Sequence, residues 1–269
     1  MNKIFIKIIA ISIALSSCEK DILVSSNTKD IPVIQSFIIA GSDSIAVNVS
    51  TLKPYSNDTL DSVEPISGLK IYINNLLLTE GSIGKYYVKS QALTIEPNDT
   101  FTISLEHNNT KISSQTIIPS TPQNFSISTD SVSVKQMTTK PEGGPNLSNF
   151  VNLELTWDNP SKDYHFLAIE WLGTKRIYTN TIISTDDIKT KRITSANQDN
   201  AYNINQMELG LYGKYRAILY RINKEYYDLL ETTNLNSNDM TNPPSNVKNG
   251  WGIFTAMNTD TIYFWVIKK

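Results

Sequence analysis

Short runs of alternating apolar residues, each ended by turn residues, constrain this chain more than any other feature. Between residues 31 and 119 about seven such runs follow one another, with Gly, Asn, Asp or Pro residues between them. Alternation with a period of two predicts strands that bury one face. Several short strands at this spacing predict a β-sandwich of immunoglobulin or transthyretin type, which we place at residues 31–119.

Residues 120–269 are predicted to form a second, β-rich domain with one short helix. Val151–Trp157 alternates, and a turn at Asp158–Pro160 leads into a partner strand at Tyr164–Trp171. The helical spacing of several apolar residues predicts a short helix over Lys224–Thr232. Further strands are expected at Arg176–Ser184, Lys191–Thr194, Lys214–Asn223, Gly252–Met257 and Thr261–Ile267. A turn at Asn258–Asp260 is predicted to join the last two. The final strand is apolar on both faces, so we expect it to be buried.

Composition and motifs argue against catalysis and nucleic-acid binding. Lys plus Arg number 24 and Asp plus Glu number 26, so the chain lacks the basic surface that phosphate backbones require. The two histidines accompany no nucleophile or zinc motif. We expect His107 to be exposed in a turn and His165 to be a partly buried structural residue on a strand. The acids Asp58, Asp61 and Glu64 do not have the spacing of a calcium loop. We therefore predict a protein that is not an enzyme and that holds no metal or cofactor.

The N-terminus has the layout of a secretory signal peptide, which we predict at residues 1–17. Two positive charges, Lys3 and Lys7, precede the apolar run Ile8–Leu15. This run is shorter than the roughly 20 residues that span a bilayer. The segment LSSC, residues 15–18, then resembles a bacterial lipobox, in which the cysteine takes a diacylglycerol and fatty acyl chains such as palmitate. An ordinary signal peptide followed by a chance cysteine is the alternative.

Cys18 is the only cysteine of the chain, which excludes a disulfide or a cysteine zinc site within it. Lipidation at Cys18 predicts a membrane anchor, with residues 18–30 as a polar tether. The charged residues 19–21 resemble the surface-export signals of Bacteroidota lipoproteins. We therefore expect a lipoprotein anchored in the outer membrane and exposed on the cell surface rather than facing the periplasm.

A repeated triplet marks candidate O-glycosylation sites. Every Asp that is followed by Ser or Thr in this chain is then followed by an apolar residue, a pattern that resembles the acceptor of Bacteroidota protein O-glycosylation. A turn Asp that leads into a β-branched strand gives the same triplet, and this is the alternative. The candidate acceptors are Ser44, Thr59, Ser62, Thr100, Ser131 and Thr261.

The C-terminal region holds a candidate partner or ligand loop. Gly250 and Gly252 flank Trp251, a few residues after Asn246. Glycines permit positive φ or close backbone approach. The segment is therefore either a loop that exposes Trp251 as an anchor for a glycan or peptide, or the tight start of a buried strand. Other tryptophans are candidate platforms for sugar stacking, although their strand positions make core or edge roles simpler: Trp157, Trp171 and Trp265.

Three parts of the chain together resemble a known family. They are the lipobox, the run from Gly84-Lys85-Tyr86-Tyr87 to Ile118-Pro119, and the C-terminal run NPPSNVKNGWGIFTAMNTDTIYFWV. Over essentially the whole mature chain, the sequence is similar to Bacteroidota outer-membrane lipoproteins that carry domain of unknown function 4249. One departure is Trp251, where the family often has Leu.

The resemblance implies a lipoprotein of a kind often encoded beside TonB-dependent outer-membrane transporters, and it supplies no catalytic residue. We therefore expect a non-enzymatic accessory or docking subunit of a TonB-dependent transporter, with that outer-membrane receptor as its partner. The alternative is a surface glycan-binding module of a nutrient-uptake system.

Overall fold

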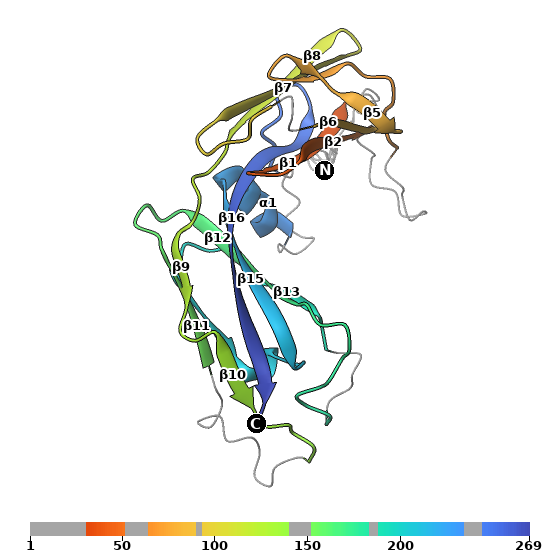
Figure 1. The fold of residues 1–269 in the computed structure, drawn as a ribbon. Coiled ribbons are helices and arrows are strands. Elements are labelled where there is room, and N and C mark those ends of the chain that lie inside the picture. The colour runs from red at the N-terminus through yellow and green to blue at the C-terminus, as the bar shows by residue number, and fades with distance from the viewer. Residues whose placement is uncertain (1–30, 52–63, 90–92, 140–151, 183–187, 234–243) are drawn as a thin grey trace, which may run out of the picture.

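The computed structural model describes residues 31–51, 64–89, 93–139, 152–182, 188–233 and 244–269. These residues form two β-sandwiches that lie end to end, with one short helix at their junction (Figure 1). The predominance of strands confirms the predicted mainly β class. The predicted short helix is also present as α1 (Lys224–Thr233).

The first sandwich buries an apolar core between two sheets. One sheet has the strand order β5-β6-β2-β1-β16, and the other has the order β4-β3-β7-β8. Ile34, Val47 and Phe101 lie in this core with 1% exposure or less, and burying a side chain of this kind stabilises the fold by roughly 1.5–3 kcal/mol. The strands are β1 (Pro32–Ile39), β2 (Ser44–Thr51), β3 (Ile71–Ile73), β4 (Leu76–Leu77), β5 (Thr79–Ser82), β6 (Lys85–Lys89), β7 (Thr100–His107) and β8 (Thr110–Ile117).

The second sandwich repeats this layered arrangement around a separate core. One sheet has the order β13-β12-β15-β16, with β10 on the far side of β16, and the other has the order β14-β11-β9. Leu155, Leu167 and Phe264 are buried between the two sheets. The strands are β9 (Gln123–Ile127), β10 (Ser131–Val134), β11 (Asn152–Asp158), β12 (Tyr164–Trp171), β13 (Lys191–Ile193), β14 (Ala201–Asn205) and β15 (Gly213–Ile222).

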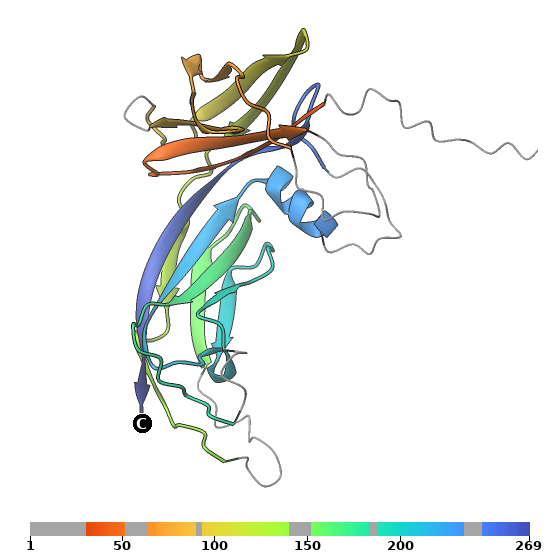
Figure 2. The same cartoon turned by 90° about the vertical axis from the view of Figure 1, so that its right-hand side faces the viewer.

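The last strand, β16 (Trp251–Lys268), belongs to both sandwiches. From Trp251 to Met257 it pairs in parallel with β1, and from Met257 to Val266 it pairs antiparallel with β15. Phe254 therefore lies in the first core and Phe264 in the second, and both are fully buried. Figure 2 shows this strand running along one side of the molecule, from the first sandwich to the far end of the second.

The predicted turn at Asn258–Asp260 is wrong, because all three residues are paired with β15 inside one continuous strand. The Asn258 amide is buried, and it donates hydrogen bonds to the carbonyl oxygen of Pro119 (2.9 Å) and to Oγ1 of Thr121 (3.2 Å). The turn-like composition of this segment is explained by these polar partners, which it meets where the strand passes from one core to the other.

Three further differences concern the second sandwich. In place of the predicted strand at Arg176–Ser184, its described residues form only isolated bridges. The strand β14 has the short and half-polar sequence AYNIN, which does not predict a strand. The predicted burial of the last strand is wrong for its outer face, since three of its side chains are 45–50% exposed: Tyr263, Trp265 and Ile267.

The domain boundary predicted between residues 119 and 120 falls in the segment that joins β8 of the first sandwich to β9 of the second. The C-terminal region then returns to the first sandwich, because Val247, Phe254 and Ala256 pack in its core. The first core is therefore built from two parts of the chain that are far apart in sequence.

Helix α1 contacts both sandwiches. The ring of Tyr226 packs edge-on against Phe37 of β1, with centroids 5.2 Å apart, and lies 6.4 Å from the ring of Phe166 of β12. The Oε1 atom of Glu225 accepts hydrogen bonds from the hydroxyls of Thr116 and Thr255, both at 3.0 Å. The helix thus fastens the sandwiches to each other. Within the described part of the chain, no helix has the length and apolar character needed to cross a bilayer.

The close approach of β16 to β1 depends on Gly252, which pairs with Ile34 at φ +105°. A Cβ at this position would lie 2.0 Å from the carbonyl oxygen of Ile34. We expect Gly252→Ala to lower the free energy of unfolding by roughly 3–5 kcal/mol, because positive-φ strain adds to the steric overlap. Chemical denaturation measures this change.

Gly41 provides the matched control, because its φ is +73° and a Cβ added there would meet no atom within 4 Å. Gly41→Ala should cost only about 1–2 kcal/mol, which is the strain of the left-handed conformation alone. Equal losses for the two substitutions would show that β16 does not approach β1 as closely as described.

Candidate functional site

The predicted modification residues are spread over the molecule. Cys18, Thr59 and Ser62 lie outside the described residues. The remaining hydroxyl residues stand on different strands, either exposed at the first residue of a strand (Ser44, Thr100, Ser131) or half-buried within β16 (Thr261). The structure therefore brings none of the four described hydroxyl residues together into a common site, and it leaves three of them accessible.

The predicted partner loop at residues 246–252 leads into β16, whose first residue is Trp251. The Asn246 side chain donates from Nδ2 to the carbonyl oxygen of Phe254 (2.7 Å) and accepts at Oδ1 from the Phe254 amide (3.0 Å). A Cβ at Gly250 or at Gly252 would come within 3.1 Å of a backbone carbonyl oxygen. Trp251 is half-buried and pairs with Val33. These are the contacts of a tightly packed strand start.

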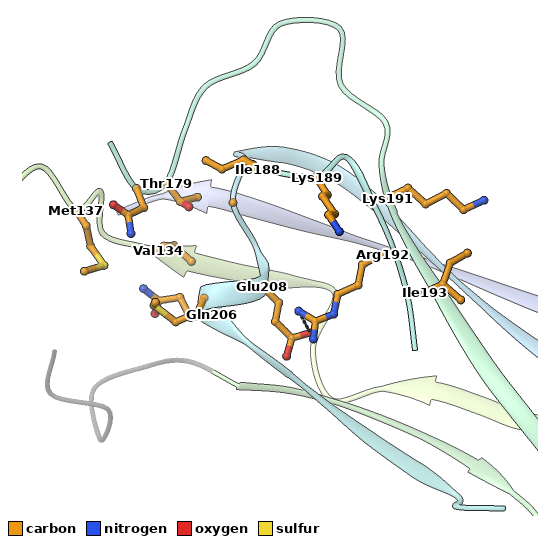
Figure 3. Close-up of a pocket in the computed structure, with 13 residues that line it drawn as sticks. Val134, Met137, Thr179, Ile188, Lys189, Lys191, Arg192, Ile193, Gln206 and Glu208 are labelled. Atoms are coloured by element: carbon orange, nitrogen blue, oxygen red, sulfur yellow. Dashed lines mark ion pairs between the residues drawn. The ribbon is translucent and has the colours of Figure 1, made fainter. Parts of the chain in front are cut away.

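A cavity of about 750 Å³ lies at the edge of the second sandwich, beside β13 and the 3-10 helix Gln206–Glu208 (Figure 3). Four segments that are distant in sequence line this cavity. They contribute Val134 and Met137, Thr179 and Asn180, residues between 188 and 193, and residues between 206 and 210.

Basic side chains predominate around the cavity. The guanidinium of Arg192 lies 3.3 Å from Oε2 of Glu208, and the same oxygen accepts a hydrogen bond from the Tyr202 hydroxyl (2.9 Å). Burial, together with this hydrogen bond to Glu208, raises the pKa of Tyr202. Lys191 is paired with Glu170 of β12 (2.8 Å). Among the described residues, the charged lining consists of three cations and one acid: Lys189, Lys191, Arg192 and Glu208.

The outer face of β16 in the second sandwich carries exposed aromatic side chains. Tyr263 and Trp265 are each 50% exposed, and they lie two residues apart, so both stand on the same face of the strand. The ammonium group of Lys214 lies 4.5 Å from the centroid of the Tyr263 ring, within range of a cation–π interaction. Beside them, Arg216 of β15 pairs with Glu170. This face combines aromatic rings with cationic groups.

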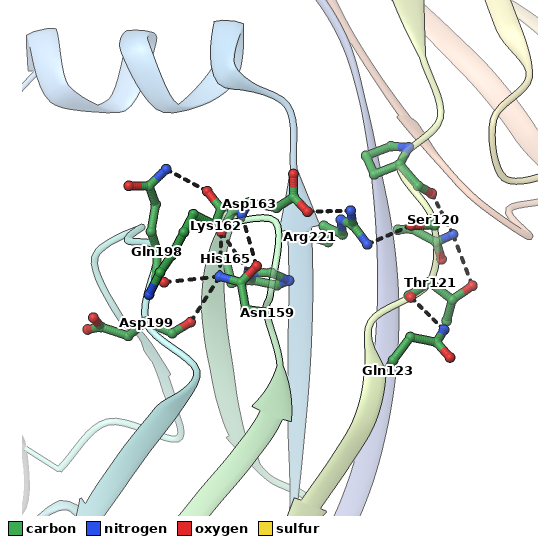
Figure 4. Close-up of polar contacts among 12 residues, drawn as sticks. Ser120, Thr121, Gln123, Asn159, Lys162, Asp163, His165, Gln198, Asp199 and Arg221 are labelled. Carbon is green, nitrogen blue, oxygen red and sulfur yellow. Dashed lines mark hydrogen bonds and ion pairs between the residues drawn. The ribbon is translucent and has the colours of Figure 1, made fainter.

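A polar network closes the end of the second sandwich that faces the first (Figure 4). Arg221 of β15 donates hydrogen bonds to the Asp163 carboxylate and to the Ser120 hydroxyl, and so ties β15 to the segment between the sandwiches. The Asn159 side chain bonds the Asp163 backbone at both its carbonyl oxygen (2.9 Å) and its amide (2.9 Å). Each of these groups is satisfied by the fold itself, which is typical of a structural network.

His165 is fully enclosed next to this network. Its Nδ1 lies 3.0 Å from the Asp163 carbonyl oxygen, while its Nε2 is buried without a hydrogen-bond partner among the described residues. Its ring lies 5.9 Å from that of Trp157. Burial, and to a lesser degree the charge of Arg221, lowers the pKa of His165, against the hydrogen bond to the Asp163 carbonyl. The neutral form is therefore the one that fits this position.

The sequence did not single out Tyr263 or the lining of the cavity. The run KTKR, residues 189–192, was the available signal, since it places three cations within four residues. This run becomes part of a cavity only because the fold brings other segments beside it, including Thr179 and Glu208. In the described part of the chain, no three His, Cys, Asp or Glu side chains are grouped so that they can hold a metal ion.

The environment of His165 makes a prediction about pH. Well above pH 6.5 the side chain is neutral in both the folded and the unfolded state. Below that value the unfolded chain takes up a proton that the folded chain does not, because the folded pKa is lowered. The free energy of unfolding should fall as the pH drops from 6.5 toward the folded pKa, by about 1.4 kcal/mol for each unit of lowering. Urea denaturation at pH 7.5 and pH 5.0 measures the loss.

His165→Gln should make this loss smaller, because the titrating group is gone. His107→Gln is the control, since His107 is the last residue of β7, at the end of the first sandwich, and its replacement leaves His165 in place. The pH dependence of the control should match that of the unchanged chain. An undiminished acid loss in His165→Gln would contradict the assignment.

The chain aligns over most of its length, at low similarity, with solved structures of repeated fibronectin domains. Against the FN1–FN3 domains of chicken CNTN1, the identity is 10%, the TM-score is 0.28, and the match covers 88% of this chain and 65% of that chain. Against the central fibronectin-III array of RIM-binding protein, the identity is 10% and the TM-score 0.23, with 91% of this chain and 71% of that chain covered. Similarities this low support no argument about function.

No curated protein matches the chain by sequence. A family model described as a domain of unknown function, DUF4249, matches residues 19–262. The match extends from the segment before the first sandwich into the last strand of the second. This chain therefore belongs to the DUF4249 family.

Proposed function

We propose that this protein is a lipid-anchored, non-enzymatic subunit of the outer membrane that docks onto a TonB-dependent transporter. The observation that carries the proposal is the position of Cys18, which ends the lipobox-like segment 13 residues before Ile31, where the described body begins. A chain of that length spans at most about 45 Å when fully extended. An acyl group on Cys18 would therefore keep the first sandwich close to the bilayer surface.

The mechanism is confinement by the tether. Attachment to the membrane restricts the protein to a thin layer in which a transporter also lies. This confinement raises the effective concentration of the protein at the transporter. A weak interface then suffices for docking. Helix α1 and strand β16 join the two sandwiches, and these contacts oppose free bending between them, which favours presentation of the second sandwich at a defined distance from the first. Display on the cell surface is part of the proposal.

The anchor is tested by Cys18→Ser, which replaces the sulfur that would be acylated. In the native host, the unchanged protein should partition with membranes and incorporate labelled palmitate, and the variant should do neither. Ser17→Ala is a suitable control, because it keeps a small residue before the cysteine and should preserve both properties. Membrane association that survives the loss of the thiol would overturn the lipid anchor.

The docking role is tested by native purification from gently solubilised membranes. The unchanged protein should recover a β-barrel receptor of the TonB-dependent class, identified by mass spectrometry. Repeated recovery of the lipoprotein alone, with the anchor shown to be present, would count against docking while leaving the lipid anchor intact.

A second candidate function is glycan binding at the cell surface. It is favoured by the two half-exposed rings on one face of β16, Tyr263 and Trp265, and by the cations Lys214 and Arg216 beside them. Aromatic faces stack against apolar faces of other rings, and the same geometry suits a sugar ring. Cationic neighbours would favour glycans that carry carboxylates.

This candidate predicts a specific loss on a polysaccharide array. Trp265→Ala should weaken binding to any retained glycan by roughly tenfold, which corresponds to the upper end of an aromatic contact. Ile83→Ala removes an exposed apolar side chain of the first sandwich and should leave the signal unchanged. Absence of any bound glycan for the unchanged protein would eliminate this function.

A further inference from the structure

We infer that the cavity beside β13 is a binding site for a small carboxylate that carries an apolar chain. A volume of about 750 Å³ falls within the range of clefts that hold small ligands, about 300–1,000 Å³. The inference does not depend on the proposed function, since it rests only on the side chains and the backbone that form this cavity.

The walls of the cavity are held in place by the fold. The Met137 amide donates to the Thr179 carbonyl oxygen (2.8 Å), and the Thr179 amide donates to that of Gly210 (3.0 Å). The Thr179 hydroxyl, itself buried, donates to the Leu209 carbonyl oxygen (2.8 Å). Three segments that line the cavity are thus linked by hydrogen bonds, so a ligand would meet a preformed site and lose little free energy in ordering it.

The charges of the cavity favour an anion. Arg192 is oriented by Glu208, and Lys191 is paired with Glu170. The Lys189 ammonium has no acidic partner among the described residues, and Figure 3 shows its side chain extending toward Arg192. A carboxylate between Lys189 and Arg192 would accept charge-assisted hydrogen bonds from both.

The remaining lining is apolar and partly open to solvent. Val134 and Ile188 are buried, whereas Met207 and Ile193 are 54% and 59% exposed. Methionine adapts its shape to varied apolar partners, and Met137 adds a second flexible side chain. An alkyl group or an apolar side chain would cover this surface, so the ligand needs both a carboxylate and an apolar body.

The test uses the full chain carrying Cys18→Ser, which remains free of acyl groups, and titration calorimetry with defined probes. Decanoate is the first probe, and a short apolar peptide with a free carboxylate, N-acetyl-leucyl-leucine, is the second. Binding of decanoate alone assigns the site to alkyl acids, and binding of the peptide alone assigns it to apolar C-termini. Both outcomes support the shared chemistry. Binding of neither probe overturns it.

Acetate and decyltrimethylammonium test separately whether binding requires the apolar chain and whether it requires the carboxylate. Each should bind at least roughly tenfold more weakly than the better carboxylate probe, because acetate lacks the apolar chain and the ammonium compound lacks the anion. Equal binding of the alkyl cation would show non-specific apolar association. Equal binding of acetate would show a simple anion site. Either result overturns the inference.

Two substitutions locate the binding in this cavity. Lys189→Gln should weaken the carboxylate probe by roughly tenfold, whereas Lys175→Gln, at an exposed lysine outside the lining, should not change it. Met207→Asp should abolish binding by placing a negative charge in the site, whereas Met207→Gln should retain it. Matching thermal unfolding curves establish that the variants are folded. Unchanged affinity in both Lys189→Gln and Met207→Asp would overturn the assignment.

Discussion

The backbone hydrogen bonding of β16 to strands of both sandwiches is the constraint on which the rest of the structure depends. This strand has 18 residues, and it pairs with β1 in the first sandwich and with β15 and β10 in the second. Neither core is closed without it, since Phe254 fills one and Phe264 the other. The first sandwich therefore requires residues from both ends of the chain, and closing such long loops makes its assembly entropically costly until β16 is in place.

A strand that crosses between two cores must satisfy its polar groups where no second sheet covers it. Asn258 does so by bonding the backbone and the hydroxyl of the segment that joins the sandwiches, Pro119 to Thr121. Arg221, its partner in β15, reaches the same segment through Ser120. Together with the contacts of Tyr226 to both sandwiches, these bonds oppose bending at the junction. The junction between the two sandwiches is thus held by specific polar contacts and by ring packing. A flexible linker would form no such contacts.

Local alternation was enough to predict the class of fold and many of the strands, because each strand buries one face and the sequence records that period. Long-range pairing was not predictable in this way. Asn258-Thr259-Asp260 has the composition of a turn, yet ten successive residues of β15 pair with this part of β16 and hold it extended. The cavity was also beyond local reasoning, because Val134, Thr179 and Glu208 become neighbours only after both sheets have formed. Trp251 and Trp265 lie at opposite ends of the same strand, and only the register of that strand decides which of them faces solvent more fully.

The arrangement of the two sandwiches bears on the lipid anchor that we propose at Cys18. A protein held at the start of β1 and hinged freely at its middle would sweep its second sandwich through a large volume, and the effective concentration of any surface on it would fall accordingly. Because α1 packs against both sandwiches and β16 runs through both, free bending at the junction would break these contacts, and the aromatic face of β16 and the cavity beside β13 lie in the second sandwich, beyond that junction. A junction that resists bending reduces the conformational entropy that the protein loses on binding. A small and partly polar contact area can then support a useful affinity. A surface of this kind suits a ligand or partner that is itself confined to the membrane layer, because both then meet in a restricted set of orientations.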